Sequence, residues 1–311
     1  MEKKYRSMCE FVEKNKEDYQ VNSSSNYSIL NFPLEIDLGS PSEIFLEDVF
    51  NKYYKLLELF QFDDSFTNVT KYIGKGIIDT IQTYKTGDIT KAFLDFENVL
   101  NKVPHGSYVI STITKDDDLY RMRKERDKIE KEEFYCLRNT KRHLCSPGRY
   151  SIAGYPCFYV GYSINDCFVE ISEEGSICKI NLKEENGNTL RVLDLTFNDD
   201  PEKENMFIII WPLIAACNMN YLEGREVNFK EDYIIPQFLT MYVLRHKQLL
   251  GVDGIRYYST RNRNLDIKGK GENDYRNIVF FPLGNTNNYV DALMDMFSFE
   301  EGKNEQKIVK L

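Results

Sequence analysis

The chain has 311 residues, of which 42% are hydrophobic and 14% aromatic, enough to bury one large or two modest cores. Its net charge of −9 argues against a broad surface for nucleic acid or for an anionic membrane. Seven cysteines form no CxxC pair, so neither a zinc site nor a disulfide framework is predicted. No signal peptide is visible at the amino terminus, and the most apolar run, 207–217, is too short to span a bilayer. We expect a cytoplasmic protein without a metal.

The first third of the chain has a helical pattern. Apolar residues recur at steps of three and four over residues 44–60, 65–84 and 89–103, which predicts three amphipathic helices. Pro104-His105-Gly106 ends this region. We therefore expect residues 1–106 to form a helical domain, and we see no catalytic constellation in it.

From residue 107 onward, short apolar runs separated by turn residues replace the helical pattern. Candidate strands and helices are mixed without βαβ regularity, and neither a GxGxxG nor a Walker loop is present, which argues against a Rossmann or P-loop nucleotide site. The predicted fold class is α+β. The candidate strands are 108–113, 119–123, 158–161, 177–182, 190–195, 254–258 and 278–283, and the candidate helices are 207–218, 235–250 and 289–297.

One stretch, 146–170, carries an ordered series of polar residues, SPGRYSIAGYPCFYVGYSINDCFVE. It predicts a turn, a short buried strand bounded by Gly and Pro, and a helix with Ser163 as its N-cap and an acidic residue at the third position. Arg149, Tyr159 and Glu170 can then converge. A guanidinium, a phenol and a carboxylate in one place indicate a functional site more than a packing arrangement.

Several segments in this part of the chain resemble the RES domain family, named for an Arg, a Glu and a Ser that its members share. The resemblance covers about residues 107–285, and the helices before it resemble the HEPN-type domain that precedes RES domains in longer members. The matching segments, in chain order, are Leu119-Tyr120-Arg121, Arg149-Tyr150-Ser151, Tyr159, Glu170 and Gly254-Ile255-Arg256-Tyr257-Tyr258-Ser259.

The resemblance implies that residues 107–311 form a domain similar to ADP-ribosyltransferases, with a mixed, split β-sheet and NAD as substrate. It also implies chemistry at the nicotinamide–ribose bond without a metal. Known members are toxins of toxin–antitoxin pairs that hydrolyse or phosphorolyse NAD, or that transfer ADP-ribose to a protein. We expect an NAD glycohydrolase or phosphorylase, with transfer to a protein as the alternative.

Cleavage of this bond develops positive charge on the ribose, as in glycosidases, so one carboxylate must lie near the sugar. On the family pattern Glu170 takes that role, and Ser259 hydrogen-bonds the ribose or a phosphate. Arg121 and Arg149 suit the pyrophosphate, because a guanidinium binds phosphate oxygens bidentately.

The remaining predicted NAD-binding residues come from the same segments. Tyr159 would stack on a ring or hydrogen-bond the ribose, Tyr120 precedes the motif arginine, and Arg256 is a lesser candidate. Taken singly, each of these residues is more often a core or surface residue, so only their joint order supports the site.

Alternatives from other classes remain open. Arg138 and His143 have the R-x4-H spacing of HEPN ribonucleases, but they lie outside the helical region where that motif belongs. Cys145 and Cys157 lack a His–acid arrangement that would support a thiol nucleophile. A catalytically silent binding module is a further alternative. The apolar helix stripes suit a regulatory protein, an antitoxin or self-association, and no nucleic-acid or membrane partner is expected.

Overall fold

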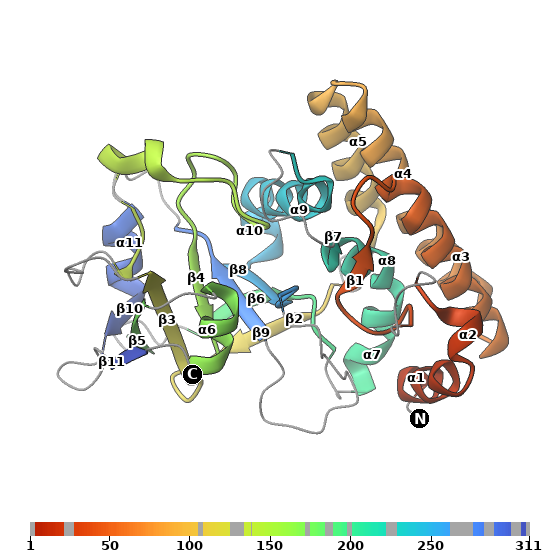
Figure 1. The fold of residues 1–311 in the computed structure, drawn as a ribbon, viewed down its shortest axis with the longest axis horizontal. Helices are drawn as coiled ribbons and strands as arrows, with labels where there is room; N and C mark the ends of the chain where they lie inside the picture. The colour runs from red at the N-terminus through yellow and green to blue at the C-terminus, as the bar shows by residue number, and fades with distance from the viewer. Residues whose placement is uncertain are drawn as a thin grey trace. The chain divides into compact units, whose positions relative to one another are not determined.

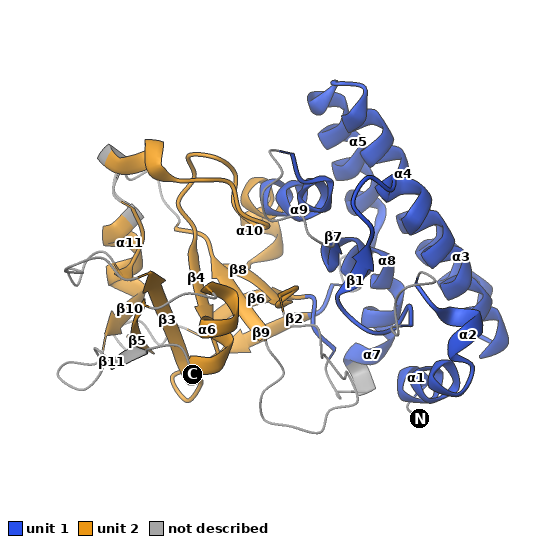
Figure 2. Cartoon of the chain, in the orientation of Figure 1, with its two compact units in different colours: residues 1–109, 195–242, 263–270 blue, residues 110–194, 243–262, 271–311 orange. Residues whose placement is uncertain are grey.

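The chain forms an α+β fold, as predicted, with helices and a mixed sheet (Figure 1). The coordinates are a computed structural model that describes residues 4–21, 28–104, 108–124, 134–137, 139–171, 175–183, 189–197, 201–221, 229–261, 276–282, 289–299 and 306–308. The chain divides into two compact units (Figure 2). Unit 1 contains residues 1–109, 195–242 and 263–270, and unit 2 contains residues 110–194, 243–262 and 271–311.

Unit 1 is built mainly of helices, and the three predicted amphipathic helices are present. Asp63 and Asp88 cap two of them, since their carboxylates accept hydrogen bonds from the backbone N–H groups of Ser65 and Lys91. No helix within the described ranges is long and apolar enough to cross a bilayer. The helices are α1 (Lys4–Lys14), α2 (Lys16–Tyr19), α3 (Ser42–Leu59), α4 (Asp64–Lys85), α5 (Ile89–Lys102), α7 (Pro201–Ile209), α8 (Trp211–Cys217) and α9 (Ile234–Arg245).

Residues 195–242 complete the core of unit 1, although the sequence placed them in the second domain. Strand β1 (Leu34–Ile36) pairs in parallel with β7 (Met219–Tyr221). The ring of Tyr53 stacks on Trp211 with centroids 3.9 Å apart, and its hydroxyl donates to the carbonyl of Ile208 at 3.0 Å. The predicted division into 1–106 and 107–311 stays a prediction. The compact units differ from it in that residues 195–242 group with the amino-terminal helices, because helical periodicity does not show which partner an apolar stripe packs against.

Unit 2 is organised around one sheet in the order β10-β5-β3-β4-β9-β8-β6-β2, with β11 also pairing with β5. Its neighbouring strands are antiparallel except for β6 and β8, so the sheet is mixed. All seven predicted strands are present. The strands are β2 (Ile110–Ile113), β3 (Leu119–Lys124), β4 (Phe158–Gly161), β5 (Gly175–Leu182), β6 (Leu190–Asp194), β8 (Gly254–Tyr258), β9 (Arg276–Phe280), β10 (Phe297–Phe299) and β11 (Gln306–Ile308).

Strands β3 and β4 are paired over a much shorter length than β3 and β5. Strands β3 and β4 pair at Tyr120 with Gly161, whereas β3 pairs with β5 along its whole length from Leu119 to Lys124. Unit 2 also contains the short helices α6 (Ile164–Ile171), α10 (Lys247–Leu250) and α11 (Tyr289–Met296).

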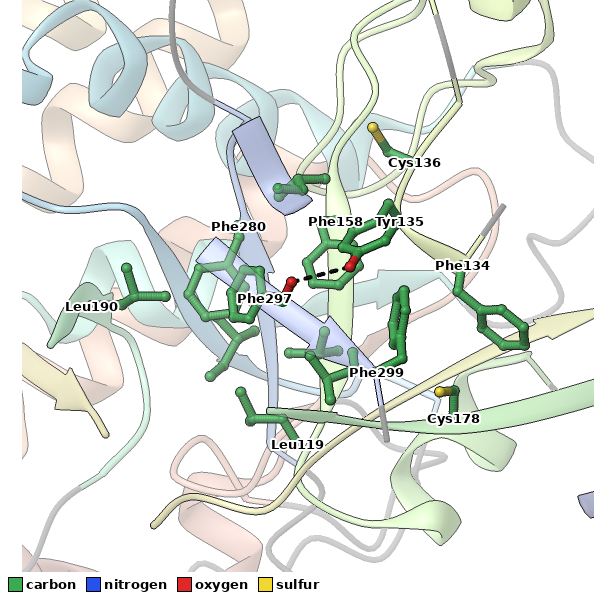
Figure 3. Close-up of a cluster of buried hydrophobic side chains, with 14 of the residues drawn as sticks. Leu119, Phe134, Tyr135, Cys136, Phe158, Cys178, Leu190, Phe280, Phe297 and Phe299 are labelled. Atoms are coloured by element: carbon green, nitrogen blue, oxygen red, sulfur yellow. Dashed lines mark hydrogen bonds between the residues drawn. The ribbon is translucent and has the colours of Figure 1, made fainter. Parts of the chain in front are cut away.

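The two faces of this sheet carry different side chains, because residues alternate between faces along a strand. One face, which we call the aromatic face, holds Phe158, Phe280 and Phe297, and the hydroxyl of Tyr135 donates to the carbonyl of Phe297 at 3.0 Å (Figure 3). The other face, which we call the α6 face, carries a small cluster in which Met122, Ile177 and Cys167 of α6 pack together. This alternation decides which predicted site residues can meet.

Candidate functional site

The carboxylate of Glu170 accepts hydrogen bonds from buried side chains and is also partly exposed to solvent. Its Oε2 atom accepts hydrogen bonds from the Ser259 hydroxyl at 2.9 Å and from the Asn277 amide at 3.3 Å. Its Oε1 atom lies 3.7 Å from Nε of Arg261, a weak and half-exposed ion pair. The side chain of Glu170 is 34% exposed, so a ligand can reach it.

Three elements bring these groups together on the α6 face. Ser259 directly follows β8, and Asn277 lies in β9, opposite both Gly161 of β4 and Tyr257 of β8. A Cβ atom at Gly161 would lie 3.1 Å from Oδ1 of Asn277 and 3.0 Å from Cβ of Asp166. The missing side chain therefore gives Asn277 room beside α6.

Helix α6 begins where the sequence predicts it. The backbone N–H of Asp166 donates to the hydroxyl of Ser163 at 3.0 Å, which is the expected N-cap bond. Cys167 and Ile171 pack toward the sheet against the Met122 cluster. Burial raises the pKa of the Cys167 thiol to about 12. The cap and this packing fix the helix that carries Glu170.

Tyr257 is surrounded by several of the predicted site residues. Burial raises the pKa of its phenol well above the ordinary value, and the acidic groups of Glu170, Tyr159 and Tyr150 raise it further, whereas the charge of Arg149 opposes the shift. Its ring centroid lies 4.5 Å from that of Tyr150. The structure thus gathers Arg149, Tyr159 and Glu170 around one buried phenol.

A tight turn positions Arg149. The backbone N–H of Gly148 donates to the carbonyl of Ser151 at 2.9 Å, and the reverse bond measures 3.3 Å. A Cβ atom at Gly148 would approach Oγ of Ser151 to 2.6 Å and the Tyr159 hydroxyl to 3.2 Å, so this close approach requires glycine. Burial raises the pKa of Tyr159 well above its ordinary value, partly offset by the Ser151 hydroxyl.

Arg121 lies on the aromatic face, away from its sequence neighbour Tyr120. Its guanidinium sits over the ring of Phe158 at 4.7 Å and donates to the carbonyl of Tyr159 at 2.5 Å. The residue is only 5% exposed, and burial lowers its pKa well below the ordinary value. Tyr120 instead packs against the Met122 cluster under α6.

Arg256 also lies on the aromatic face, since its strand partner Ile278 belongs to that cluster. It forms a buried ion pair with Asp194 and donates to the Tyr162 hydroxyl at 3.1 Å. Burial opposes its charge, but the hydrogen bond to Asp194 and that carboxylate's charge outweigh it and raise the pKa of Arg256. These contacts are those of a structural ion pair.

The structure therefore places Ser259 in contact with Glu170, and it puts Tyr159 and Arg149 within electrostatic range of the same buried phenol, Tyr257. It places Arg121 and Arg256 on the opposite face. The functional roles of all these residues stay predictions. Asn277, Arg261 and Tyr257 were not among the site residues predicted from the sequence, and Tyr257 stood there only within the matching segment 254–259. One signal was present for two of them, because Tyr257, Ser259 and Arg261 follow one another at two-residue spacing.

The alternative nucleophiles gain no support from the described residues, and the ribonuclease motif is only partly described, so it stays untested. Burial raises the pKa of both Cys145 and Cys157, which keeps them as thiols at neutral pH. His143 is exposed on a 3-10 helix, Asn139–Leu144, and Arg138 lies outside the described residues.

Unit 1 contains a separate pocket of about 240 Å³, lined in part by Tyr221 and Phe229. Its ionic groups are already paired, because Lys85 lies 2.7 Å from Glu43 and 3.0 Å from Glu231. Glu231 also accepts from the Ser42 hydroxyl at 2.7 Å, at the start of α3. These ionic contacts stabilise the start of α3 and leave no charged group of the pocket without a described partner. The Glu170 cluster, whose carboxylate is accessible, is therefore the better candidate site.

The fold and this cluster define an α+β protein with an anchored, accessible carboxylate. No family model matches the chain, and no solved structure matches it. Over 268 residues it is 26% identical to a curated protein of Bacillus subtilis (strain 168) named "Putative toxin YopC". The alignment covers 76% of this chain and 60% of that protein, so the chain spans about three fifths of its relative's length. A distant relationship to a protein named as a toxin is thereby established, and RES family membership stays a prediction.

Proposed function

We propose that this protein is a toxin-type enzyme that cleaves the nicotinamide–ribose bond of NAD, with Glu170 as the catalytic carboxylate. The observation that carries the proposal is the Glu170 cluster, in which internal donors hold one carboxylate oxygen while the side chain stays 34% exposed. The toxin name of the relative and the RES-like order of residues support the same function.

The proposed role of Glu170 follows from the positive charge that develops on the ribose during cleavage. As the bond to nicotinamide breaks, the ribose becomes cationic, and nicotinamide departs with the bonding electron pair. A carboxylate already oriented at the sugar stabilises that cation without reorganising during the reaction. Ser259 and Asn277 supply this orientation by donating to Oε2 of Glu170, which leaves Oε1 for the ribose.

The arginines suited to the NAD pyrophosphate are those on the same face as Glu170. Arg149 is only 9% exposed, and its charge acts on the phenol of Tyr257 on that face. Arg261 lies beside Oε1 of Glu170 with its side chain 41% exposed. A guanidinium with this exposure is free to turn from the carboxylate to a phosphate, which it binds bidentately. Tyr159 would flank the ribose or the nicotinamide ring.

Arg121 and Arg256 contribute differently. Both lie on the aromatic face, away from Glu170, so their support for this function is indirect: the Arg121 guanidinium donates to the carbonyl of Tyr159, and Arg256 forms an ion pair with Asp194. We therefore assign the pyrophosphate to Arg149 and Arg261. In the cell, a protein antitoxin would be the partner that neutralises such an enzyme.

Purified protein incubated with NAD tests the proposal, with nicotinamide release followed by chromatography in the presence and absence of phosphate. Glu170→Ala serves as the inactive comparison. ADP-ribose as product indicates hydrolysis, and a phosphorylated ADP-ribose that requires phosphate indicates phosphorolysis. A mass gain on an added bacterial protein, with little free ADP-ribose, would show instead that the enzyme is an ADP-ribosyltransferase. Absence of all three products would contradict NAD cleavage.

A further inference from the structure

We propose that Asn277 is a positioning residue that fixes the carboxylate of Glu170 for its reaction. The inference rests on the proposed function where it concerns catalysis, and on contacts within unit 2 where it concerns the pair itself. None of the short segments that carry the RES resemblance includes Asn277, which lies in β9 after the last of them.

The first observation is that the side chain of Asn277 is buried and that its amide donates to Glu170. Asn277 is only 3% exposed, and its side-chain amide donates to Oε2 of Glu170 at 3.3 Å. A buried amide needs partners, because an unsatisfied donor costs roughly 1–3 kcal/mol. The residue is buried and its N–H group donates to the carboxylate, so we infer that Asn277 acts through Glu170 and not through its own contact with a ligand.

The second support is that two neutral donors converge on the same oxygen. Ser259 is fully buried and donates to Oε2 from the end of β8, while Asn277 donates from the adjacent strand β9. Two fixed donors on one oxygen define the plane of the carboxylate. They leave the negative charge in place, since neither donor carries a charge. Oε1 then faces the half-exposed Arg261 and any ligand.

The third support is the space provided by Gly161. Asn277 pairs with Gly161 in the sheet, and a Cβ atom there would lie 3.1 Å from Oδ1 of Asn277. Such a contact is tight enough to displace either the amide or α6. Glycine at this position therefore allows the amide to lie between the sheet and the helix that carries Glu170.

Steady-state nicotinamide release from NAD tests the catalytic part, using Asn277→Ala and Asn277→Asp in the full chain. A freed carboxylate is misplaced, and misplacement at a reacting centre costs on the order of 10- to 100-fold in rate. We expect kcat to fall by that factor with KM within about threefold of the parent value. Asn277→Asp, which keeps the side-chain shape, should lose more, because it sets a second carboxylate against Glu170.

Ser111→Ala is the matched control. Ser111 also donates to a buried carboxylate of this sheet, at 2.6 Å to Asp194 on the aromatic face, so its loss reproduces the structural effect without touching Glu170. It should leave kcat within about twofold. If folded Asn277→Asp or Asn277→Ala matched the parent kcat, or if the control lost as much as they do, the positioning role would be overturned.

A double-mutant cycle tests the pair without any assay of activity. Chemical unfolding is measured for the parent, Glu170→Ala, Asn277→Ala and the double variant. We expect the double variant to lose less stability than the sum of the single losses, because residues in contact are coupled. If the losses of stability from the two single variants simply added, the proposed contact between Asn277 and Glu170 would be contradicted. If the parent released no nicotinamide, NAD cleavage would fail as the function, while this coupling would still decide whether Asn277 holds Glu170.

Discussion

Two carboxylates of unit 2, Asp194 in strand β6 and Glu170 in helix α6, have partners of opposite kinds. Asp194 is fully buried and is neutralised by the guanidinium of Arg256. Glu170 is held by the neutral donors Ser259 and Asn277, and its nearest described cation is a weakly paired Arg261. A carboxylate that keeps its charge can stabilise a cation in a ligand, whereas a neutralised one serves the fold. This contrast separates the candidate catalytic residue from the structural one.

Arg256→Met should destabilise the protein by about 3–5 kcal/mol, because it leaves the charge of Asp194 buried without its partner. Asp194→Asn in the same chain should recover much of that loss, since the remaining group is neutral. Urea unfolding followed by circular dichroism measures both. Equal stability of the single and double variants would show that the ion pair does not have this structural role.

Asp166 gives a pH-dependent prediction. Burial raises the pKa of its carboxyl, although hydrogen bonds from Ser163 oppose the shift. An acid with a raised folded pKa weakens the fold once it ionises, so the cost is absent below its unfolded pKa of about 3.9 and complete above the folded pKa. Asp166→Asn should therefore unfold at higher urea than the parent at pH 7.

The gain from Asp166→Asn should disappear as the pH falls below the unfolded pKa, where both side chains are neutral. Urea unfolding of both proteins across this acidic range measures the difference. An unchanged gain at the lowest pH would mean that shape, and not charge, causes it.

At the scale of elements, the sequence predicted most helices and strands because their signals are local. The apolar stripes of α3, α4 and α5 repeat with the helical period, and all seven candidate strands formed. The predicted helix 207–218 is instead divided at Ile210 into α7 and α8, and the predicted helix 235–250 is divided at His246 into α9 and α10. These breaks occur inside apolar runs, where periodicity gives little information.

Pairing between strands that are distant in the chain could not be predicted from the sequence. Strands β1 and β7 have three residues each and become strands only by pairing with one another across most of the chain. The candidate site shows the same limit. Tyr120 and Arg121 are adjacent in the family-like motif, yet strand alternation places them on opposite faces. Which face carries α6 depends on tertiary packing, so the sequence could not tell which arginines accompany Glu170.

The packing of α4 on α5 gives a prediction at this scale. A Cβ atom at Gly76 would lie 2.2 Å from Cγ2 of Val99, so Gly76→Ala should destabilise the protein by about 1–3 kcal/mol despite the higher helix propensity of alanine. The cost should shrink in a Val99→Ala background, which removes the two closest contacts, those with the Cγ atoms of Val99. Lys75→Ala, on the exposed side of α4, is the control and should change little.

Thermal unfolding measures these four variants. A Gly76→Ala cost that is equal in both backgrounds would contradict the close approach of the two helices.

At the scale of the whole molecule, the amino-terminal helices and residues 195–242 share one core. Trp211 is fully buried against Tyr53, Phe50 and Phe32. The chain therefore leaves unit 1 after residue 109, builds part of unit 2 and returns. Helical pattern alone suggested a domain complete at residue 106, whereas the buried tryptophan of the later segment packs in the same core as the amino-terminal helices.

A fragment of residues 1–106 should consequently fail to form a fixed core, because it exposes the apolar surface that α7, α8 and β7 cover in the full chain. Near-ultraviolet circular dichroism should be weak, and amide signals poorly dispersed. A fragment with sharp, dispersed amide signals would show that the helices are stable alone. In the full chain, fluorescence of Trp211, the single tryptophan, reports on unit 1 during unfolding.

The most direct test of the central claim is the rate of nicotinamide release from NAD by Glu170→Gln relative to the parent. Glutamine preserves the size of the side chain and can still accept from Ser259, so it removes the charge and little else. Loss of a preorganised group at a developing charge costs roughly 100- to 1,000-fold, and we predict a decrease of that size in kcat with folding unchanged. A parent that releases nicotinamide and a folded Glu170→Gln variant that matches its rate would contradict Glu170 as the catalytic carboxylate.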